Sequence, residues 1–181
     1  VEIGAAMSLE RLGAEFGAVV MAAGTLRPNL LDLPGKAFSG IEHGLRFLLE
    51  VNEFGRREVG RRVVVIGGGY TAMDCARTAL RLGASVTVTY RRAREDMVVL
   101  PGEVEELVEE GGRLETNCSP VQFLGEHGKV TGARFVRTRQ GEPGRDGRRL
   151  PVDVPNSEVD FDADTIILAT GQFPQAAWID P

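Results

Sequence analysis

The feature that most restricts the fold is a run of three glycines between two apolar segments of different periodicity. Residues 63–66 (VVVI) predict a short strand buried on both faces. Residues 70–82 predict a helix, with a face of small residues able to pack closely on a sheet, and Gly83 stands where a helix often ends. A strand, a glycine turn and a helix in this order are typical of a βαβ unit.

The turn and the helix start fit the pattern G-x-G-x-x-G/A, with Ala72 in the last place. Gly67 would permit the tight turn, and Gly69 would let a diphosphate approach the backbone. The amides at the helix start would bind the phosphates with help from the helix dipole. The predicted contact residues are Gly67, Gly68, Gly69, Tyr70, Thr71 and Ala72; the alternative is a tight turn without a ligand.

The residues after the next predicted strand (85–90) distinguish between the two nicotinamide dinucleotides. A site for NAD would carry an acidic residue there, to bind the ribose 2′-hydroxyl group. This chain instead has Arg91, Arg92 and Arg94, and guanidinium groups bind a 2′-phosphate through charge-assisted hydrogen bonds. We therefore predict a preference for NADPH, with an exposed charged turn as the alternative.

The rest of the chain predicts a doubly wound α/β sheet of the Rossmann type, crossed by an antiparallel β flap. Residues 55–62 (GRREVGRR) predict a solvated linker or, alternatively, a patch that attracts an anionic cofactor. The remaining predicted elements are strands at 17–24, 114–117, 121–125, 130–139 and 164–171, helices at 42–54 and 102–110, and a long loop or hairpin tip at 140–157.

Composition excludes several classes of function. Acidic residues outnumber basic ones by 26 to 21, which argues against general nucleic-acid binding. No apolar run is long enough for a membrane helix, and no signal-peptide pattern is present, so we expect a cytoplasmic protein. The two cysteines, Cys75 and Cys118, are too few for a disulfide framework or a four-cysteine zinc site, and we expect no metal. The two histidines, His43 and His127, are expected to be surface residues.

The run VVVIGGGYTAMDCARTALRLGASVTVTYRR (63–92) resembles the NADPH-binding domain of the glutamate synthase small (beta) subunit. A related part of dihydropyrimidine dehydrogenase is similar. The supporting stretches are AAGTLRPNLLDLPG (22–35), DGRRLPVDVPNSE (146–158) and ILATGQFP (167–174). The resemblance covers nearly the whole chain and identifies it with the FAD-dependent pyridine nucleotide-disulfide oxidoreductases, in which an NADPH domain is inserted into a split FAD domain.

This resemblance implies three segments. Residues 1–37 would close the first half of the FAD domain, residues 38–168 would form the NADPH domain, and residues 169–181 would return to the FAD domain. Ala169, Thr170 and Gly171 would line the nicotinamide side of the site. Tyr70 departs from the Asn or Asp that relatives carry, and an aromatic ring there would narrow the pocket or stack on the cofactor. The chain start at Val1 leads us to expect a piece of a larger protein, with a processed or incompletely recorded chain as the alternative.

The resemblance also implies a function. The parent protein would pass a hydride from NADPH to FAD, and electrons would continue through iron–sulfur clusters to the glutamate synthase large subunit. No acid–base residue is predicted, because the cofactors carry the chemistry. Three alternatives stay open: a related reductase with another electron acceptor, a module that binds NADPH without catalysis, and a dinucleotide-type fold used only for interaction.

Overall fold

The computed structural model describes residues 3, 6–56, 58–144 and 147–174. The chain divides into two units. One comprises Leu30–Gly171, and the other comprises the segments Val1–Asn29 and Gln172–Pro181. These boundaries differ from the predicted ones at 37 and 168, and the assignment of the segments to FAD and NADPH domains stays a prediction.

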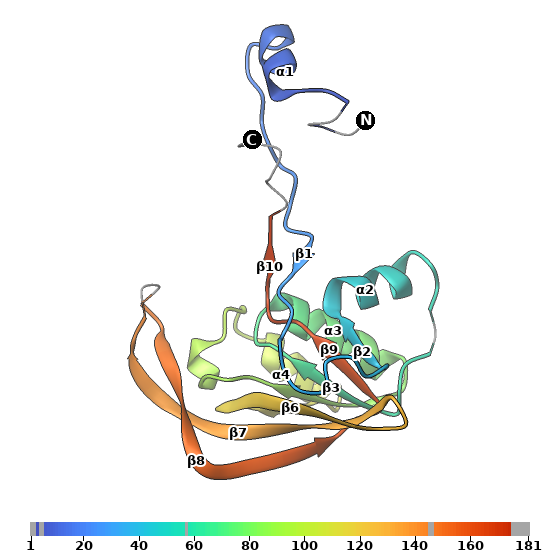
Figure 1. Cartoon of the computed structure of the whole chain (residues 1–181), viewed down its shortest axis with the longest axis vertical. Coiled ribbons are helices and arrows are strands. Elements are labelled where there is room, and N and C mark those ends of the chain that lie inside the picture. The colour runs from blue at the N-terminus through green and yellow to red at the C-terminus, as the bar shows by residue number, and fades with distance from the viewer. Residues whose placement is uncertain (1–2, 4–5, 57, 145–146, 175–181) are drawn as a thin grey trace. The chain divides into compact units, whose positions relative to one another are not determined.

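The larger unit is built on a five-stranded parallel sheet with the strand order β2-β9-β3-β4-β5 (Figure 1). Its strands are β2 (Ile41–His43), β3 (Arg62–Ile66), β4 (Ser85–Thr89), β5 (Arg113–Glu115) and β9 (Thr165–Leu168). The helices are α2 (Gly44–Asn52), α3 (Tyr70–Arg81) and α4 (Glu103–Glu109), with a 3₁₀ turn, η1, at Arg94–Asp96. The predicted fold class is confirmed.

The alternation of side chains along β3 explains why this strand is apolar on both faces. Val63 and Val65 pack in a core cluster with residues of α2, α3 and α4. Val64 and Ile66 pack in a second cluster with Phe123 and other residues of the antiparallel sheet. Successive side chains of a strand point to opposite faces, so the parallel sheet lies between helices on one side and a second sheet on the other.

That second sheet is the predicted antiparallel flap, and it is longer than the sequence indicated (Figure 1). It consists of β6 (Cys118–Glu126), β7 (Lys129–Pro143) and β8 (Arg149–Asp162). Of the two alternatives predicted for 140–157, the hairpin tip is confirmed. The long loop is wrong for most of the stretch, because β7 and β8 continue to pair from Thr138↔Asp153 to Pro143↔Arg149. Strand pairing supplies hydrogen bonds that override the turn residues of this stretch.

The smaller unit contains α1 (Leu9–Glu15) and an antiparallel ribbon of β1 (Arg27–Pro28) and β10 (Gln172–Phe173). The Ser8 side chain caps α1 by accepting a hydrogen bond from the amide of Arg11 (3.2 Å). The predicted strand at 17–24 is wrong: these residues have no regular structure and are exposed. Its apolar run has no pairing strand among the described residues, and an unpaired strand leaves its backbone groups to water. None of the described helices is long and apolar enough to cross a bilayer.

Candidate nucleotide-binding site

The glycine turn lies between the carboxyl end of β3 and the start of α3, and its first two glycines are required by packing. A Cβ atom at Gly67 would lie 2.2 Å from the carbonyl oxygen of Ala169. A Cβ atom at Gly68 would lie 2.4 Å from the ring of Tyr90. Both distances are far below van der Waals contact. Gly67 therefore allows the ends of β3 and β9 to approach, and Gly68 allows the turn to rest on Tyr90.

Gly69 differs from its two neighbours. No atom of the described residues lies within 4 Å of the place where its Cβ would be, and its φ angle of −111° is accessible to any residue. The protein itself gives no reason for a glycine here, whereas a diphosphate approaching the backbone would. Gly69 is also the N-cap of α3, whose first turn carries no acidic side chain to compete with an anion.

The other predicted residues of this turn are placed as follows. Tyr70 is the first residue of α3, and its side chain is 47% exposed. Thr71 is half-buried. Ala72 is fully buried in the helix-side core, which agrees with the close helix packing expected of the last position in the motif. The contacts of these residues with a phosphate stay a prediction.

The three arginines after β4 are in three different environments. Arg91 is exposed, and within the described part of the chain its guanidinium has no hydrogen bond or ion pair. Arg92 is buried, and its Nε donates to the carbonyl oxygen of Arg149 in β8 (2.9 Å). Arg94 forms an ion pair with Glu105 at the start of α4. Arg91 is thus the one of the three with its whole guanidinium available, and phosphate binding by all three stays a prediction.

The predicted nicotinamide-side residues lie directly after β9. The amide of Ala169 donates to the carbonyl oxygen of Ile66 at the end of β3 (2.8 Å). Thr170 and Gly171 continue from there, and Gly171 has a φ angle of +103°. The chain leaves β3 toward β4 on one side, while β9 lies on the other, so the topological switch point of the sheet lies between β3 and β9. Ligands of open α/β sheets bind outside the carboxyl ends of the strands at such a point.

His43 also lies at the carboxyl end of a parallel strand, and it was not predicted to belong to the site. It ends β2, opposite Leu168 of β9, and it is the N-cap of α2. Its Nε2 is buried and has no partner among the described residues. Burial lowers the pKa of His43, while a hydrogen bond with the backbone of Gly171 acts in the opposite direction. The residue as a whole is half-buried, so the expected surface location holds only in part. The register of β2 on β9 places it here, and that pairing is not visible in the sequence.

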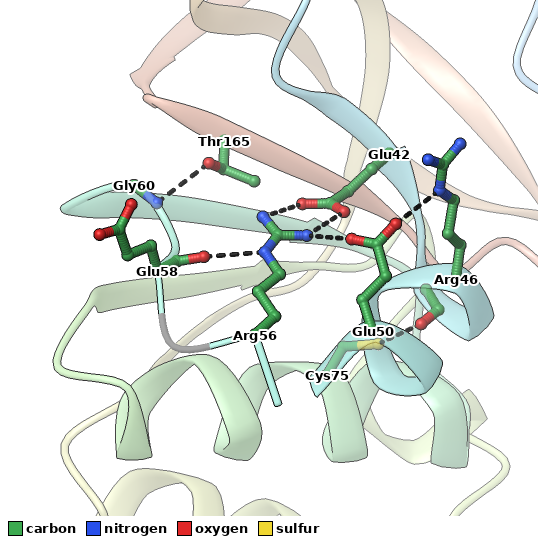
Figure 2. Close-up of polar contacts among 9 residues, drawn as sticks. Glu42, Arg46, Glu50, Arg56, Glu58, Gly60, Cys75 and Thr165 are labelled. Atoms are coloured by element: carbon green, nitrogen blue, oxygen red, sulfur yellow. Dashed lines mark hydrogen bonds and ion pairs between the residues drawn. The ribbon is translucent and has the colours of Figure 1, made fainter. Parts of the chain in front are cut away.

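The linker before β3 is partly neutralised within the chain (Figure 2). Both terminal nitrogens of Arg56 bond to Glu42 (2.6 and 2.9 Å), and one also reaches Glu50 (3.0 Å). Its Nε donates to the carbonyl oxygen of Glu58 (2.8 Å). Arg56 therefore joins the linker to β2 and α2. Its positive charge is neutralised by these glutamates, so it would not contribute to the cofactor-attracting patch that was the alternative prediction for this linker. Nearby, the thiol of the buried Cys75 in α3 donates to the carbonyl oxygen of Gly44 (3.5 Å).

Comparison with known proteins gives the family of this chain. The family model described as pyridine nucleotide-disulphide oxidoreductase matches residues 9–180. The NADPH-Fe(3+) oxidoreductase subunit beta of Geobacter sulfurreducens is 42% identical over 98% of this chain and 27% of its own length. The glutamate synthase [NADPH] small chain of Halomonas elongata is 41% identical over 99% of this chain and 40% of its own length. The chain thus spans less than half the length of these relatives.

Solved structures share the fold. Mycobacterium tuberculosis FprA in complex with NADPH has a TM-score of 0.76 at 18% identity, covering 95% of this chain and 54% of that one. Thioredoxin reductase of T. acidophilum has a TM-score of 0.61 at 20% identity, covering 86% of this chain and 44% of that one. At these identities the likeness concerns the fold alone.

Proposed function

The chain belongs to the pyridine nucleotide-disulphide oxidoreductase family, and from this premise we propose that it is the NADPH-binding part of a flavin-dependent oxidoreductase. One observation carries the proposal. Gly69 has no atom of the described residues in the place of a Cβ, and Arg91 is exposed and unpaired among the described residues; the two follow the adjacent parallel strands β3 and β4. A dinucleotide diphosphate and a 2′-phosphate are the groups that such an arrangement fits.

The residues of this chain would act by binding and orienting. Gly67–Ala72 would hold the diphosphate at the start of α3, and Arg91 would bind the 2′-phosphate, with Arg92 and Arg94 contributing to the positive charge. Ala169, Thr170 and Gly171 would position the nicotinamide at the carboxyl end of β9. When bound, NADPH supplies a hydride to FAD, and positioning is the main contribution a protein makes to such a transfer.

We propose that the FAD is held largely by parts of the parent protein outside this chain, with the smaller unit contributing. Two relatives at 41–42% identity are named as a glutamate synthase [NADPH] small chain and as a subunit of an NADPH-Fe(3+) oxidoreductase. We therefore propose two candidate acceptors, a glutamate synthase large subunit, which the family resemblance implies is reached through iron–sulfur clusters, and Fe(3+). We favour the first, because the quoted motifs resemble the glutamate synthase small subunit. Reduction of the FAD-loaded parent protein by NADPH, followed by addition of either acceptor, distinguishes the two.

The nucleotide assignment is tested by calorimetric titration of the chain with NADPH and NADH. We expect the natural chain to prefer NADPH, and Arg91→Gln to weaken NADPH binding about tenfold or more while NADH binding stays unchanged. Arg61→Gln is the matched control. Arg61 is an exposed arginine just before β3, at the amino ends of the parallel strands, whereas Arg91 follows the carboxyl end of β4. Equal affinity of the natural chain for the two nucleotides would contradict the proposal.

A further inference from the structure

The loop that carries the three arginines is fastened by the antiparallel sheet as well as by the parallel one. The hydroxyl group of Thr138 in β7 donates to the carbonyl oxygen of Arg91 (2.8 Å). The amide of Asn117 donates to the carbonyl oxygen of Arg92 (2.9 Å), and the amide of Thr138 donates in turn to the carbonyl oxygen of Asn117 (2.8 Å). With the bond from Arg92 to Arg149 in β8, a closed set of contacts holds the backbone on both sides of the arginine side chains.

The pairing of β7 with β8 is irregular beside Thr138. Val136 pairs with Glu158 and Thr138 with Asp153, so residues 154–157 of β8 stand opposite Arg137 alone and form a bulge in β8. Bulges of this kind recur beside binding sites. Thr138 is 7% exposed although it carries a hydroxyl group, and its bond to Arg91 accounts for this burial. The guanidinium of Arg137 donates a hydrogen bond to the carboxylate of Glu115 (3.2 Å). Its positive charge is therefore paired outside the loop that carries Arg91, Arg92 and Arg94.

We propose that Thr138 is a positioning residue for the 2′-phosphate site, so that the antiparallel sheet takes part in selecting NADPH over NADH. This inference rests on the proposed function. The guanidinium of Arg91 has no partner within the described ranges, and Thr138 fixes the backbone that carries it. A fixed backbone reduces the conformational entropy that Arg91 loses when it binds a phosphate. NADH has no phosphate at this place, so its binding does not depend on Thr138.

The test compares Thr138→Val, which keeps the shape of the side chain and removes the hydroxyl group, with Thr138→Ser, which keeps the hydroxyl group. We expect Thr138→Val to weaken NADPH binding about five- to tenfold, with NADH affinity unchanged within about twofold. Thr138→Ser restores NADPH affinity to about that of the natural chain. Thr131→Val is the control, because Thr131 is exposed on the same strand and its hydroxyl group bonds to none of the described residues.

The outcomes separate this inference from the proposed function. If the natural chain binds NADPH no more tightly than NADH, the proposed function is wrong and the role of Thr138 with it. If the natural chain prefers NADPH but Thr138→Val weakens neither nucleotide or weakens both equally, only the role of Thr138 is wrong. Thr138→Ala removes the same hydroxyl group with less bulk, and replaces Thr138→Val if thermal unfolding shows that Thr138→Val does not fold.

Discussion

The three adjacent glycines differ in what an added side chain would meet. Only at Gly69 do we propose that the need for a glycine comes from a ligand. Gly67 and Gly68 face backbone and ring atoms at distances that forbid a Cβ, whereas Gly69 faces open space. We predict that Gly69→Ala leaves the unfolding temperature nearly unchanged and weakens NADPH binding about tenfold, because the added methyl group occupies the path of the diphosphate. Calorimetry and thermal unfolding measure the two effects separately.

Two variants serve as controls for this prediction. Gly68→Ala should destabilise the fold by about 1–3 kcal/mol, since the Tyr90 ring is buried and its hydroxyl group is held by the carbonyl oxygen of Asp96 (2.9 Å). Gly17→Ala, also in open space, should change neither property. Tight NADPH binding by Gly69→Ala would show that the diphosphate does not pass over this residue.

His43 gives a prediction about pH. Burial lowers its pKa in the folded chain below the ordinary value of 6.5. As the pH falls, His43 therefore takes up a proton in the unfolded chain before it does so in the folded chain. The free energy of unfolding consequently decreases as the pH falls below about 6.5. We expect His43→Gln to reduce the loss of stability between about pH 7.5 and about pH 5.5, measured by urea unfolding.

The other histidine supplies the comparison. His127 is exposed in a turn with a φ angle of +50°, a conformation that asparagine tolerates, so His127→Asn is the suitable control. It should leave the pH dependence of unfolding as in the natural chain. The same loss of stability in His43→Gln and the natural chain would argue against a lowered pKa of His43 in the folded chain.

At the scale of elements, α3 is held at the end far from the glycines by charges of α4. Glu110, which ends α4, accepts hydrogen bonds from Arg77 (2.7 Å) and Arg81 (2.8 and 3.1 Å) of α3. Bonds from Arg81 and then Arg77 lower the pKa of Glu110 below its ordinary value of 4.5. A carboxyl group whose pKa is lower in the folded chain stabilises the fold at pH values above its ordinary pKa. This stability is lost as the pH falls through the pKa of the folded state.

We therefore predict that Glu110→Gln lowers the unfolding temperature at neutral pH and reduces the loss of stability on acidification below about pH 5. The expected effect is small, because Arg81 is exposed and the side chains of Arg77 and Glu110 are only partly buried. Glu109→Gln on the same helix removes one negative charge without an ion pair among the described residues, and should change neither property. Equal behaviour of the two variants would show that the contacts of Glu110 do not stabilise the packing of α3 on α4.

The elements that sequence predicted well are those whose neighbours lie close along the chain. The βαβ unit of β3, α3 and β4 was predicted within one residue at each end, because its apolar periodicity and its glycines are local signals. The extension of β7 and β8 to the tip of their hairpin was missed, since it depends on pairing between strands rich in turn residues. For the same reason the position of Arg91 was predictable, while the burial of Arg92 was not, because its partner Arg149 is 57 residues away.

At the scale of the whole molecule, the buried apolar side chains mark out one folding unit. All those of the described residues lie between Phe47 and Ala169, and most of them form two clusters on the two faces of the parallel sheet. In contrast, α1 of the smaller unit has no buried residue. Burial of apolar surface is the main favourable term in folding, so the unit Leu30–Gly171 contains the source of its own stability.

We predict that residues 30–171 alone fold cooperatively and bind NADPH within about twofold of the complete chain, whereas residues 38–171 are less stable by about 2 kcal/mol. Leu31 and Leu33 pack on the second cluster, and the carbonyl oxygen of Pro34 accepts a hydrogen bond from the amide of Phe123 in β6 (2.9 Å). The shorter piece loses these contacts and exposes Phe123 and its neighbours. Urea unfolding measures the difference, and binding of a hydrophobic dye reports loosened packing. Equal stability of the two pieces would mean that the boundary predicted at residue 37 describes the folding unit better than the one at residue 29.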